Sequence, residues 1–453
     1  TDKRPPSRPH VMRFPSSTLG QHRRRRGVQT LAALAFAFSS AFAFATDNAP
    51  DSPALAEPVL GANVDELIEY ARRNHPAFAA ERAEAAAALE RIVPAGALPD
   101  PTVGVELMDF GNAMRNRSAS LVPGQVGETR YQISQPLPGW GKRELASRAA
   151  EARAGQAAAT RDATWTELVA RIEAAWLRYY VAGRELALSQ QGLTLLQRLE
   201  ELSLKRFELG LVPQQAVLRT QREITAQRVA LLEAEQRSKG LAAALNGLLA
   251  RPPQAPLAAP SEPPPLPERL DAAALFDAAR TRNPEVQTST AGIEVARAER
   301  ERTYQDRLPD FSVGLRNDRP YEGKSSWALM FEVMVPLQQA SRRAREREAE
   351  YMITAAEARR ADAQARASGE LGRLWSAFAS NRDSLRLLER TLLPQAIATR
   401  DAARAALANG KVDFDSVIEA ERQLIDIRTR ALQAEQDARL ALVEIERITG
   451  APK

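Results

Sequence analysis

The chain of 453 residues contains no cysteine, only three histidines and few aromatic residues, which make up 6% of it. Without cysteine it forms no disulfide, no thiolate metal site and no acylated N-terminal cysteine. His75 is the only histidine after residue 45, so a metal site built from histidine and cysteine is excluded. We therefore expect no resident metal and no cofactor.

Sequence motifs of catalysis are missing as well. The chain has no glycine-rich phosphate loop, no nucleophile elbow and no zinc-hydrolase motif. With one histidine after the leader and no cysteine, catalysis would depend on carboxylates, and these are not paired in a recognisable catalytic pattern. These absences predict a protein that is not an enzyme and has no catalytic residues.

Long apolar runs are also scarce. One, LAALAFAFSSAFAFA at 31–45, follows four arginines at 23–26 and ends in Ala-Phe-Ala. This order is typical of a signal peptide, so we expect residues 1–45 to be a leader cleaved before Thr46, with Met12 as a candidate start. A retained membrane anchor is the alternative. No apolar run of 18 residues follows, so a mature chain that crosses a membrane must do so as β-structure.

The excess of positive charge belongs to the leader and not to the rest of the chain. The whole chain has a net charge of +5 at pH 7, but the residues after position 45 comprise 54 basic and 56 acidic ones. A nucleic-acid-binding function therefore loses its main support.

The sequence does contain a long internal repeat. Residues 208–224 read ELGLVPQQAVLRTQREI and residues 408–424 read ANGKVDFDSVIEAERQL, with Gly210 and Gly410 at matching positions. A proline-rich stretch between the two repeats cannot be helical and should be extended. We divide the mature chain into an N-terminal extension (46–62), a first repeat (63–250), this linker (251–267) and a second repeat (268–450).

Both repeats have the same order of predicted elements. A helix interrupted at Pro76 or Pro284 comes first. Two alternating segments follow, then a very long helix at ~142–208 or ~340–408, the glycine turn and a last helix. At 1.5 Å per residue each long helix measures roughly 100 Å, which a small globular domain does not need.

The alternating segments decide the predicted fold class. Apolar residues recur at every second position, and the residues between them are charged, polar, glycine, alanine or methionine, so that charge lies on one face as a transmembrane barrel strand requires. Amphipathic hairpins on a soluble core are the alternative. Four strands cannot close a usable barrel, whereas three copies of the chain would supply twelve. The expected strands lie at ~101–110, ~128–137, ~310–317 and ~325–336.

Several motifs point to one family. They include ISQPLPGWGKR (133–143), RLPDFSVGLR (307–316) and NGKVDFDSVIEAERQL (409–424), supported by RRNHP, RNP, VPL, LLPQA and ERITG elsewhere. With these residues the chain resembles the TolC-type outer-membrane efflux factors over ~60–450. Within them it is most similar to the branch that serves cobalt–zinc–cadmium resistance pumps.

The resemblance implies a mainly α-helical chain that forms a homotrimer, with a 12-stranded outer-membrane β-barrel and a long periplasmic α-helical tunnel. It implies an exit duct that passively conducts divalent heavy-metal cations from an inner-membrane RND-type pump to the exterior of a Gram-negative cell. The glycine turns become periplasmic tips at which a periplasmic adaptor docks. The expected tip residues are Gly210, Leu211, Val212, Gly410, Lys411 and Val412.

The family also suggests a gate. Acidic residues often constrict the tunnel entrance six and nine positions after the second tip glycine, and here these positions are Ser416 and Glu419. Only Glu419 fits, so the candidate gate is a ring of three Glu419 carboxylates, with Ser416 and Asp415 beside it. Such a ring would attract cations and favour opening by self-repulsion. A solvated glutamate on a helix face is the alternative, and Asp413 or Asp415 is a candidate helix cap.

Aromatic residues near the strands are candidates for a girdle at the membrane interface. Packing within the junction of helix and barrel is an equal alternative for one of them, Trp140. The expected external loops are 109–127 and 317–324. The candidate girdle residues are Tyr131, Trp140, Tyr321 and Trp327.

Two other functions remain open from the sequence. The same duct would also serve a drug-efflux or protein-secretion system. A periplasmic structural coiled coil without a barrel is the alternative from another class.

Overall fold

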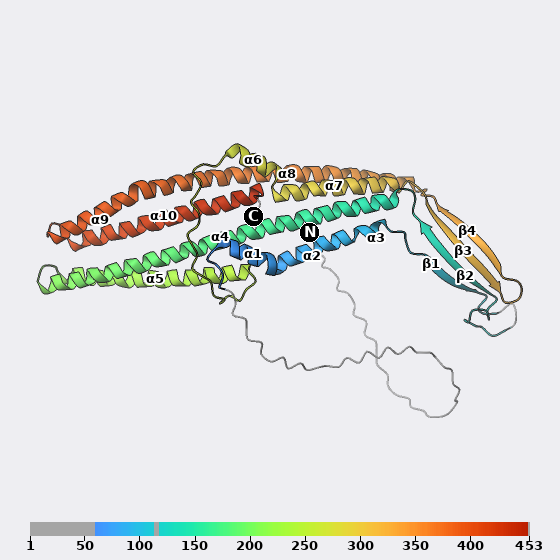
Figure 1. Ribbon diagram of the computed structural model, residues 1–453, viewed down its shortest axis with the longest axis horizontal. Helices are drawn as coiled ribbons and strands as arrows, with labels where there is room; N and C mark the ends of the chain where they lie inside the picture. Colours follow the sequence, from blue (N-terminus) through green and yellow to red (C-terminus); the bar gives the residue numbers. More distant parts are fainter. Residues whose placement is uncertain (1–58, 113–116, 452–453) are drawn as a thin grey trace, which may run out of the picture. The chain divides into compact units, whose positions relative to one another are not determined.

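The computed structural model describes residues 59–112 and 117–451, which lie in one compact unit that extends over Ala56–Lys453. The predicted leader, its cleavage site and the first part of the N-terminal extension fall outside the described residues. Within these residues helices dominate, as predicted, and four strands form one sheet. In Figure 1 the sheet lies at one end of this unit and the two glycine turns at the other.

The first repeat contains helices α1 to α5 and strands β1 and β2. Its second helix begins at Pro76, because proline lacks the N–H that a first-turn residue does not need. The long helix α4 continues without interruption for 67 residues. The helices are α1 (Val64–Asn74), α2 (Pro76–Glu90), α3 (Ile92–Gly96), α4 (Lys142–Glu208) and α5 (Gln214–Leu248).

The second repeat follows the same plan with two differences. The single helix α7 stands where the first repeat has α2 and α3. The long helix of the second repeat changes to π-helical geometry at Leu388–Leu392 (η2), just before Pro394, whose ring and missing N–H disturb the regular hydrogen bonds. The helices are α6 (Ala272–Thr281), α7 (Pro284–Gln305), α8 (Gln339–Leu387), α9 (Leu393–Ala408) and α10 (Phe414–Thr449).

The long helices form the spine of the unit. Helix α4 packs against α5 on the side of the turns and against α2 and α7 on the side of the sheet, while α8 packs against α7 and α10. One apolar core joins α1, α2 and α4 around Leu67 and Ile172, and another joins α8 and α10 around Leu371 and Ile445. The chain between the repeats crosses this region, where Leu60 and Leu257 form an isolated parallel bridge.

The four strands form an antiparallel sheet in the order β1-β2-β3-β4. The outer edges of β1 and β4 have no strand partner among the described residues. Because β2 pairs with β3, the sheet joins the first repeat to the second (Figure 1). The strands are β1 (Thr102–Met108), β2 (Glu128–Leu137), β3 (Asp310–Pro320) and β4 (Ser326–Met334).

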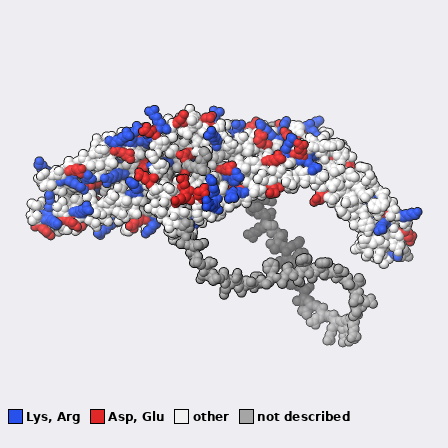
Figure 2. All heavy atoms as spheres, in the orientation of Figure 1, with Lys and Arg blue, Asp and Glu red and all other residues white. Residues whose placement is uncertain are grey.

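The two faces of the sheet differ in chemistry. The register aligns Val103, Ile133, Leu315 and Leu329 in one row, so apolar side chains from all four strands share a face. Apolar side chains at its edges remain open to solvent, and Phe331 is 73% exposed. Figure 2 shows dense charge over the helices and little charge over most of the sheet.

One expected loop is shorter than predicted. The polar run 317–320 was expected to begin the connection between the last two strands, but β3 continues to Pro320 and leaves only 321–325 between the strands. The reason is long-range: Arg130 on β2 binds Asp318, and Tyr131 pairs with Asn317.

No helix in residues 59–112 or 117–451 combines the length and the apolar character that a bilayer crossing needs.

Candidate functional site

The two glycine turns have the same backbone. Gly210 and Gly410 take φ values of 69° and 67°, which glycine adopts at little cost. In the first turn the N–H of Leu211 donates to the carbonyl of Arg206, and in the second Lys411 donates to Ala406, each at 2.9 Å. These bonds satisfy the last carbonyls of α4 and α9 and define a Schellman-type helix end in both repeats.

The helices that leave the turns begin differently. In the second turn Asp413 accepts a hydrogen bond from the backbone N–H of Ser416 at 3.0 Å and another from its hydroxyl at 2.5 Å. Because the Ser416 hydroxyl and N–H stabilise the charged carboxylate, they lower the pKa of Asp413. In the first turn Pro213 occupies the same position and provides no side-chain cap. Of the two candidate caps, Asp413 therefore fills the role and Asp415 does not.

The exposed side chains of the turns also differ. Leu209 and Leu211 are 72% and 67% exposed at the first turn. Their counterparts 200 positions later are Asn409 and Lys411, which are exposed and polar. Val212 and Val412 are half-buried in both turns. The six predicted tip residues thus form two turns with one backbone shape and two surface chemistries.

A small core directly behind the turns holds the two hairpins together. It is formed by Leu196 and Leu199 of α4, Ile224 of α5, Leu407 of α9, and Phe414, Val417 and Ile418 of α10. Polar contacts reinforce it: the Arg206 guanidinium donates to the carbonyl of Leu407 at 3.0 Å, and Arg219 forms an ion pair with Asp415. The two turns are therefore one structural unit.

The three candidate gate residues have different surroundings. Asp415 is paired with Arg219, and Ser416 is engaged by the capping Asp413. Glu419 is exposed and accepts only from the amide of Gln423, at 3.2 Å, among the described residues. Of the three, Glu419 alone presents an unneutralised carboxylate on the surface of α10.

Arg219 was not among the predicted site residues, although the repeat places it at the position that matches Glu419. Arg219 stands nine positions after Gly210, as Glu419 stands nine positions after Gly410. Matching positions in the two repeats therefore carry opposite charges. In the structure Arg219 forms its ion pair with Asp415 and not with Glu419, which the sequence alone does not indicate.

The candidate aromatic residues lie in two groups. Tyr131 and Trp327 share a row of the sheet, since both pair with Asn317, and Trp327 is 69% exposed. Tyr321 follows in the adjoining loop, with the Arg117 guanidinium 4.5 Å from its ring. Trp140 lies at the opposite end of the sheet, in edge contact with Phe311 and 78% exposed.

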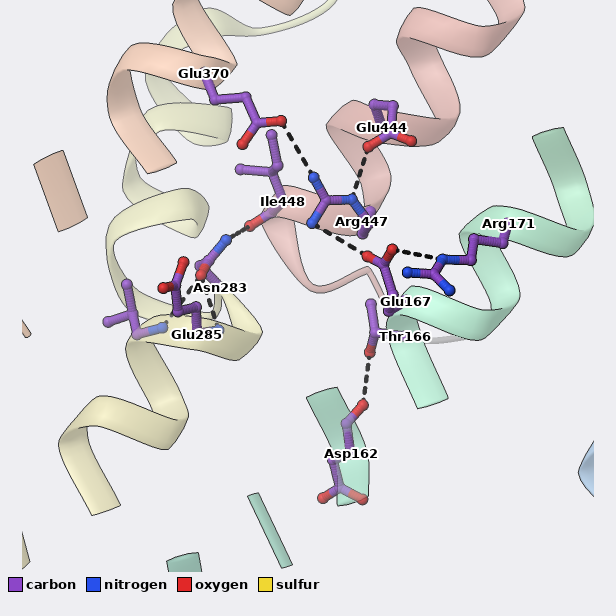
Figure 3. A network of polar contacts seen from close by, with 11 residues as sticks. Asp162, Thr166, Glu167, Arg171, Asn283, Glu285, Glu370, Glu444, Arg447 and Ile448 are labelled. Atoms are coloured by element: carbon purple, nitrogen blue, oxygen red, sulfur yellow. Dashed lines mark hydrogen bonds and ion pairs between the residues drawn. The ribbon is translucent and has the colours of Figure 1, made fainter. Parts of the chain in front are cut away.

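A charged hub near the middle of the helices was not foreseen either. Arg447 of α10 contacts Glu444 at 2.7 Å, Glu370 of α8 at 3.2 Å and Glu167 of α4 at 3.6 Å (Figure 3). Burial disfavours the charge on Arg447, but its carboxylate neighbours raise the pKa of the guanidinium. The hub ties α10 to both long helices.

Beside this hub the end of α10 meets the start of α7. Asn283 caps α7 by accepting from the N–H groups of Glu285 and Val286, and its amide donates to the carbonyl of Ile448 at 3.0 Å (Figure 3). His75 occupies the corresponding position before α2 and makes no side-chain cap. Within the part of the chain that the structure describes, no group of three or more histidine or acidic residues is placed to hold a metal.

The structure thus combines a four-stranded sheet that has one apolar face with long paired helices, of which α4 alone extends over about 100 Å. The family model of the outer membrane efflux protein matches residues 67–251 and 275–451. The chain belongs to this family, as the sequence motifs predicted.

Solved structures support the same fold. VceC from Vibrio cholerae is 17% identical with a TM-score of 0.69, over 85% of this chain and 96% of that one. The open state of the MtrE outer membrane channel from Neisseria gonorrhoeae is 15% identical with a TM-score of 0.67, over 86% and 89%. CusC is 18% identical with a TM-score of 0.70, over 86% and 92%. A search of curated proteins gave no match.

Proposed function

We propose that this chain is the outer-membrane exit duct of a tripartite efflux system and that it works as a homotrimer. Membership in the outer membrane efflux protein family is the observation that carries the proposal. In this proposal residues 1–45 are removed as a leader, and the mature chain conducts its substrate passively from an inner-membrane RND-type pump to the cell exterior.

Two parts of the chain, the sheet and the long helices, have uncovered edges, which support a closed ring of copies. In the sheet the outer edges of β1 and β4 are unpaired among the described residues. Along the helices, α5 carries Leu218 and Leu232, which are 56% and 59% exposed, and the end of α8 carries Leu387, which is 62% exposed. One edge always belongs to the first repeat and the other to the second. Head-to-tail contact between copies would cover both edges, and such contacts form a ring when the rotation from one copy to the next closes.

The two faces of the sheet support a barrel in the outer membrane. Three copies would provide twelve strands, with the apolar face toward lipid and the polar face toward water. The row that contains Tyr131 and Trp327 lies near one end of the strands, as expected of an interfacial girdle. Trp140, at the other end of the sheet, would belong to the opposite interface or to the junction with the helices.

The two turns would be the sites at which a periplasmic adaptor docks. Three copies with two turns each would present six tips from a threefold assembly. Leu209 and Leu211 would offer an apolar contact at one set of tips, and Lys411 a cationic contact at the other. The shared backbone supports equivalent docking geometry, and the different side chains would give each set its own contacts.

Glu419 would form the gate as a ring of three carboxylates, because Asp415 and Ser416 are engaged by neighbouring groups. Replacing Glu419 by Gln should weaken block of single-channel currents by divalent cations about tenfold, since the ring charge disappears. The exposed Glu208 on α4 provides a matched control, Glu208→Gln. Equal block of the Glu419→Gln and wild-type channels would remove Glu419 from the gate.

Divalent heavy-metal cations are the proposed substrate, on the sequence resemblance to the cobalt–zinc–cadmium branch. A duct for drug efflux or protein secretion is the second candidate. A deletion strain and its complemented parent should be grown with zinc, cobalt, cadmium, nickel, copper and silver salts, and with dyes and antibiotics. Sensitivity confined to divalent metals would support the proposed substrate. Sensitivity to dyes and antibiotics alone would move the duct to drug efflux.

A further inference from the structure

A cleft lies between the two repeats where α4, α9 and α10 run together toward the turns (Figure 1). It has a volume of about 490 Å³, and residues of all three helices line it. We call it the basic cleft, because its charged lining residues are four arginines and one glutamate: Arg198 of α4, Arg400 and Arg404 of α9, and Glu421 and Arg428 of α10. This excess of positive charge is local, since the chain after position 45 has nearly equal numbers of basic and acidic residues.

Two of the four arginines are neutralised within the chain. Glu421 is only 3% exposed, and its carboxylate lies 2.5 Å from the guanidinium of Arg404. Arg400 forms an ion pair at 2.7 Å with Asp401, its neighbour in sequence. These contacts use the single carboxylate of the lining and one carboxylate from outside it.

The other two arginines have no such partner. Arg198 is exposed and Arg428 is half-buried. Neither side chain forms a hydrogen bond or an ion pair with another residue in the described ranges 59–112 and 117–451. A guanidinium presents a planar set of N–H donors that matches a carboxylate. The basic cleft therefore fits an anionic partner that brings its own carboxylates.

The internal repeat shows that this charge is specific to one kind of cleft. The residues 200 positions away from the charged lining residues are Ala398, Glu200, Leu204, Gln221 and Arg228. In the proposed ring these residues would line the equivalent cleft between one copy and the next. That cleft would contain one glutamate and one arginine and would have no net charge. Three basic clefts would thus alternate with three neutral ones around the ring.

Resting on the proposed function, we propose that the basic cleft is a second docking site for the periplasmic adaptor, and that it takes an acidic segment of that partner. Arg404 stands six positions before Gly410 and Arg428 eighteen positions after it. At 1.5 Å per residue the cleft therefore lies roughly 10–25 Å from the turn. A partner that contacts the turns and continues along the helices reaches this cleft.

The alternation of clefts gives this contact a consequence for assembly. Opposite charges steer a partner toward one position and disfavour others. Because only the cleft within a chain is basic, an acidic segment would settle there and not between copies. The contact would then set the rotational position of the adaptor on the ring, which the shared backbone of the turns leaves open.

The test is the binding of a fluorescein-labelled polyglutamate peptide to the purified full-length protein in detergent, measured by fluorescence anisotropy. We expect the double variant Arg198→Gln/Arg428→Gln to bind about tenfold more weakly than the wild type, because both unpaired guanidiniums are lost. The buried ion pair of the cleft stays intact in this variant. The matched control is Arg228→Gln/Lys239→Gln on α5, which removes the same charge outside the cleft. Circular dichroism should verify that both variants keep their helices.

Three results would overturn the proposal. One is equal peptide affinity of the folded Arg198→Gln/Arg428→Gln variant and the wild type. Another is an equal loss of affinity in the α5 control, which would reflect only the net charge of the protein. The third is binding of inorganic phosphate at the two arginines without binding of the peptide, which would make the cleft a small-anion site. Failure of the proposed efflux function would appear in the growth assays and not in this binding measurement, so the two proposals fail separately.

Discussion

The turns of the two repeats have one backbone and different side chains. Both end a helix with a positive-φ glycine and the same pair of hydrogen bonds. Only the second has a capping Asp413, and only the first exposes two leucines. The duplicated geometry sets where the turns lie, while the individual side chains set what each turn contacts.

Matching positions on the two helices that leave the turns, α5 and α10, also differ in how deeply their side chains are buried. Ile418 on α10 is 5% exposed, because it lies in the small core that it forms with residues of α4, α5 and α9. Leu218, its counterpart on α5, lies outside that core and is 56% exposed. In the proposed ring the next copy would supply the missing cover. The same substitution at positions 218 and 418 therefore tests whether position 418 is covered within the chain and position 218 by the next copy.

The largest expected effect comes from a charge at these two positions. Ile418→Asp should lower the free energy of unfolding by about 4 kcal/mol, because it places a carboxylate in an apolar core. Leu218→Asp should leave the chain folded and prevent its assembly. Thermal unfolding and native mass spectrometry separate the two results. Loss of folding in both variants, or assembly of Leu218→Asp, would contradict the comparison.

A smaller effect is expected where the repeats differ before their second helices. Asn283→Ala should cost about 2 kcal/mol, because it removes the cap of α7 and the bond to Ile448. His75→Asn should gain about 1 kcal/mol by installing the missing cap on α2. Urea unfolding checks both changes. A destabilised His75→Asn variant would mean that His75 has a role that capping does not explain.

The smallest effect concerns pH at the second turn. The pKa of Asp413 is lowered by its bonds to Ser416, so the carboxylate stabilises the start of α10 above the ordinary aspartate pKa. This stabilisation is lost as pH falls through the lowered pKa. The protection of the turn amides against hydrogen exchange, measured relative to their intrinsic exchange rates, should fall below about pH 4 in the wild type. Asp413→Asn, which caps without titrating, should keep its protection, and so should the first turn.

Much of this plan follows from local chemistry. Proline sets the start of α2 and α7, glycine allows the turns, and the motifs identified the family, which is confirmed. The heavy-metal branch, the trimer and the gate remain predictions. Three features depend on partners far apart in sequence and were missed: the extension of β3 to Pro320, the pair Arg219–Asp415, and the hub at Arg447.

The central claim is that three copies close one ring through the free edges of β1 and β4. Because the chain has no cysteine, a pair introduced at Val105 and at one of positions 327, 329, 331 or 333 would be unique in the protein. Oxidation in isolated outer membranes should give, for at least one pair, a covalent trimer as the largest product. Monomers alone from every pair, or an open ladder beyond the trimer, would contradict the ring.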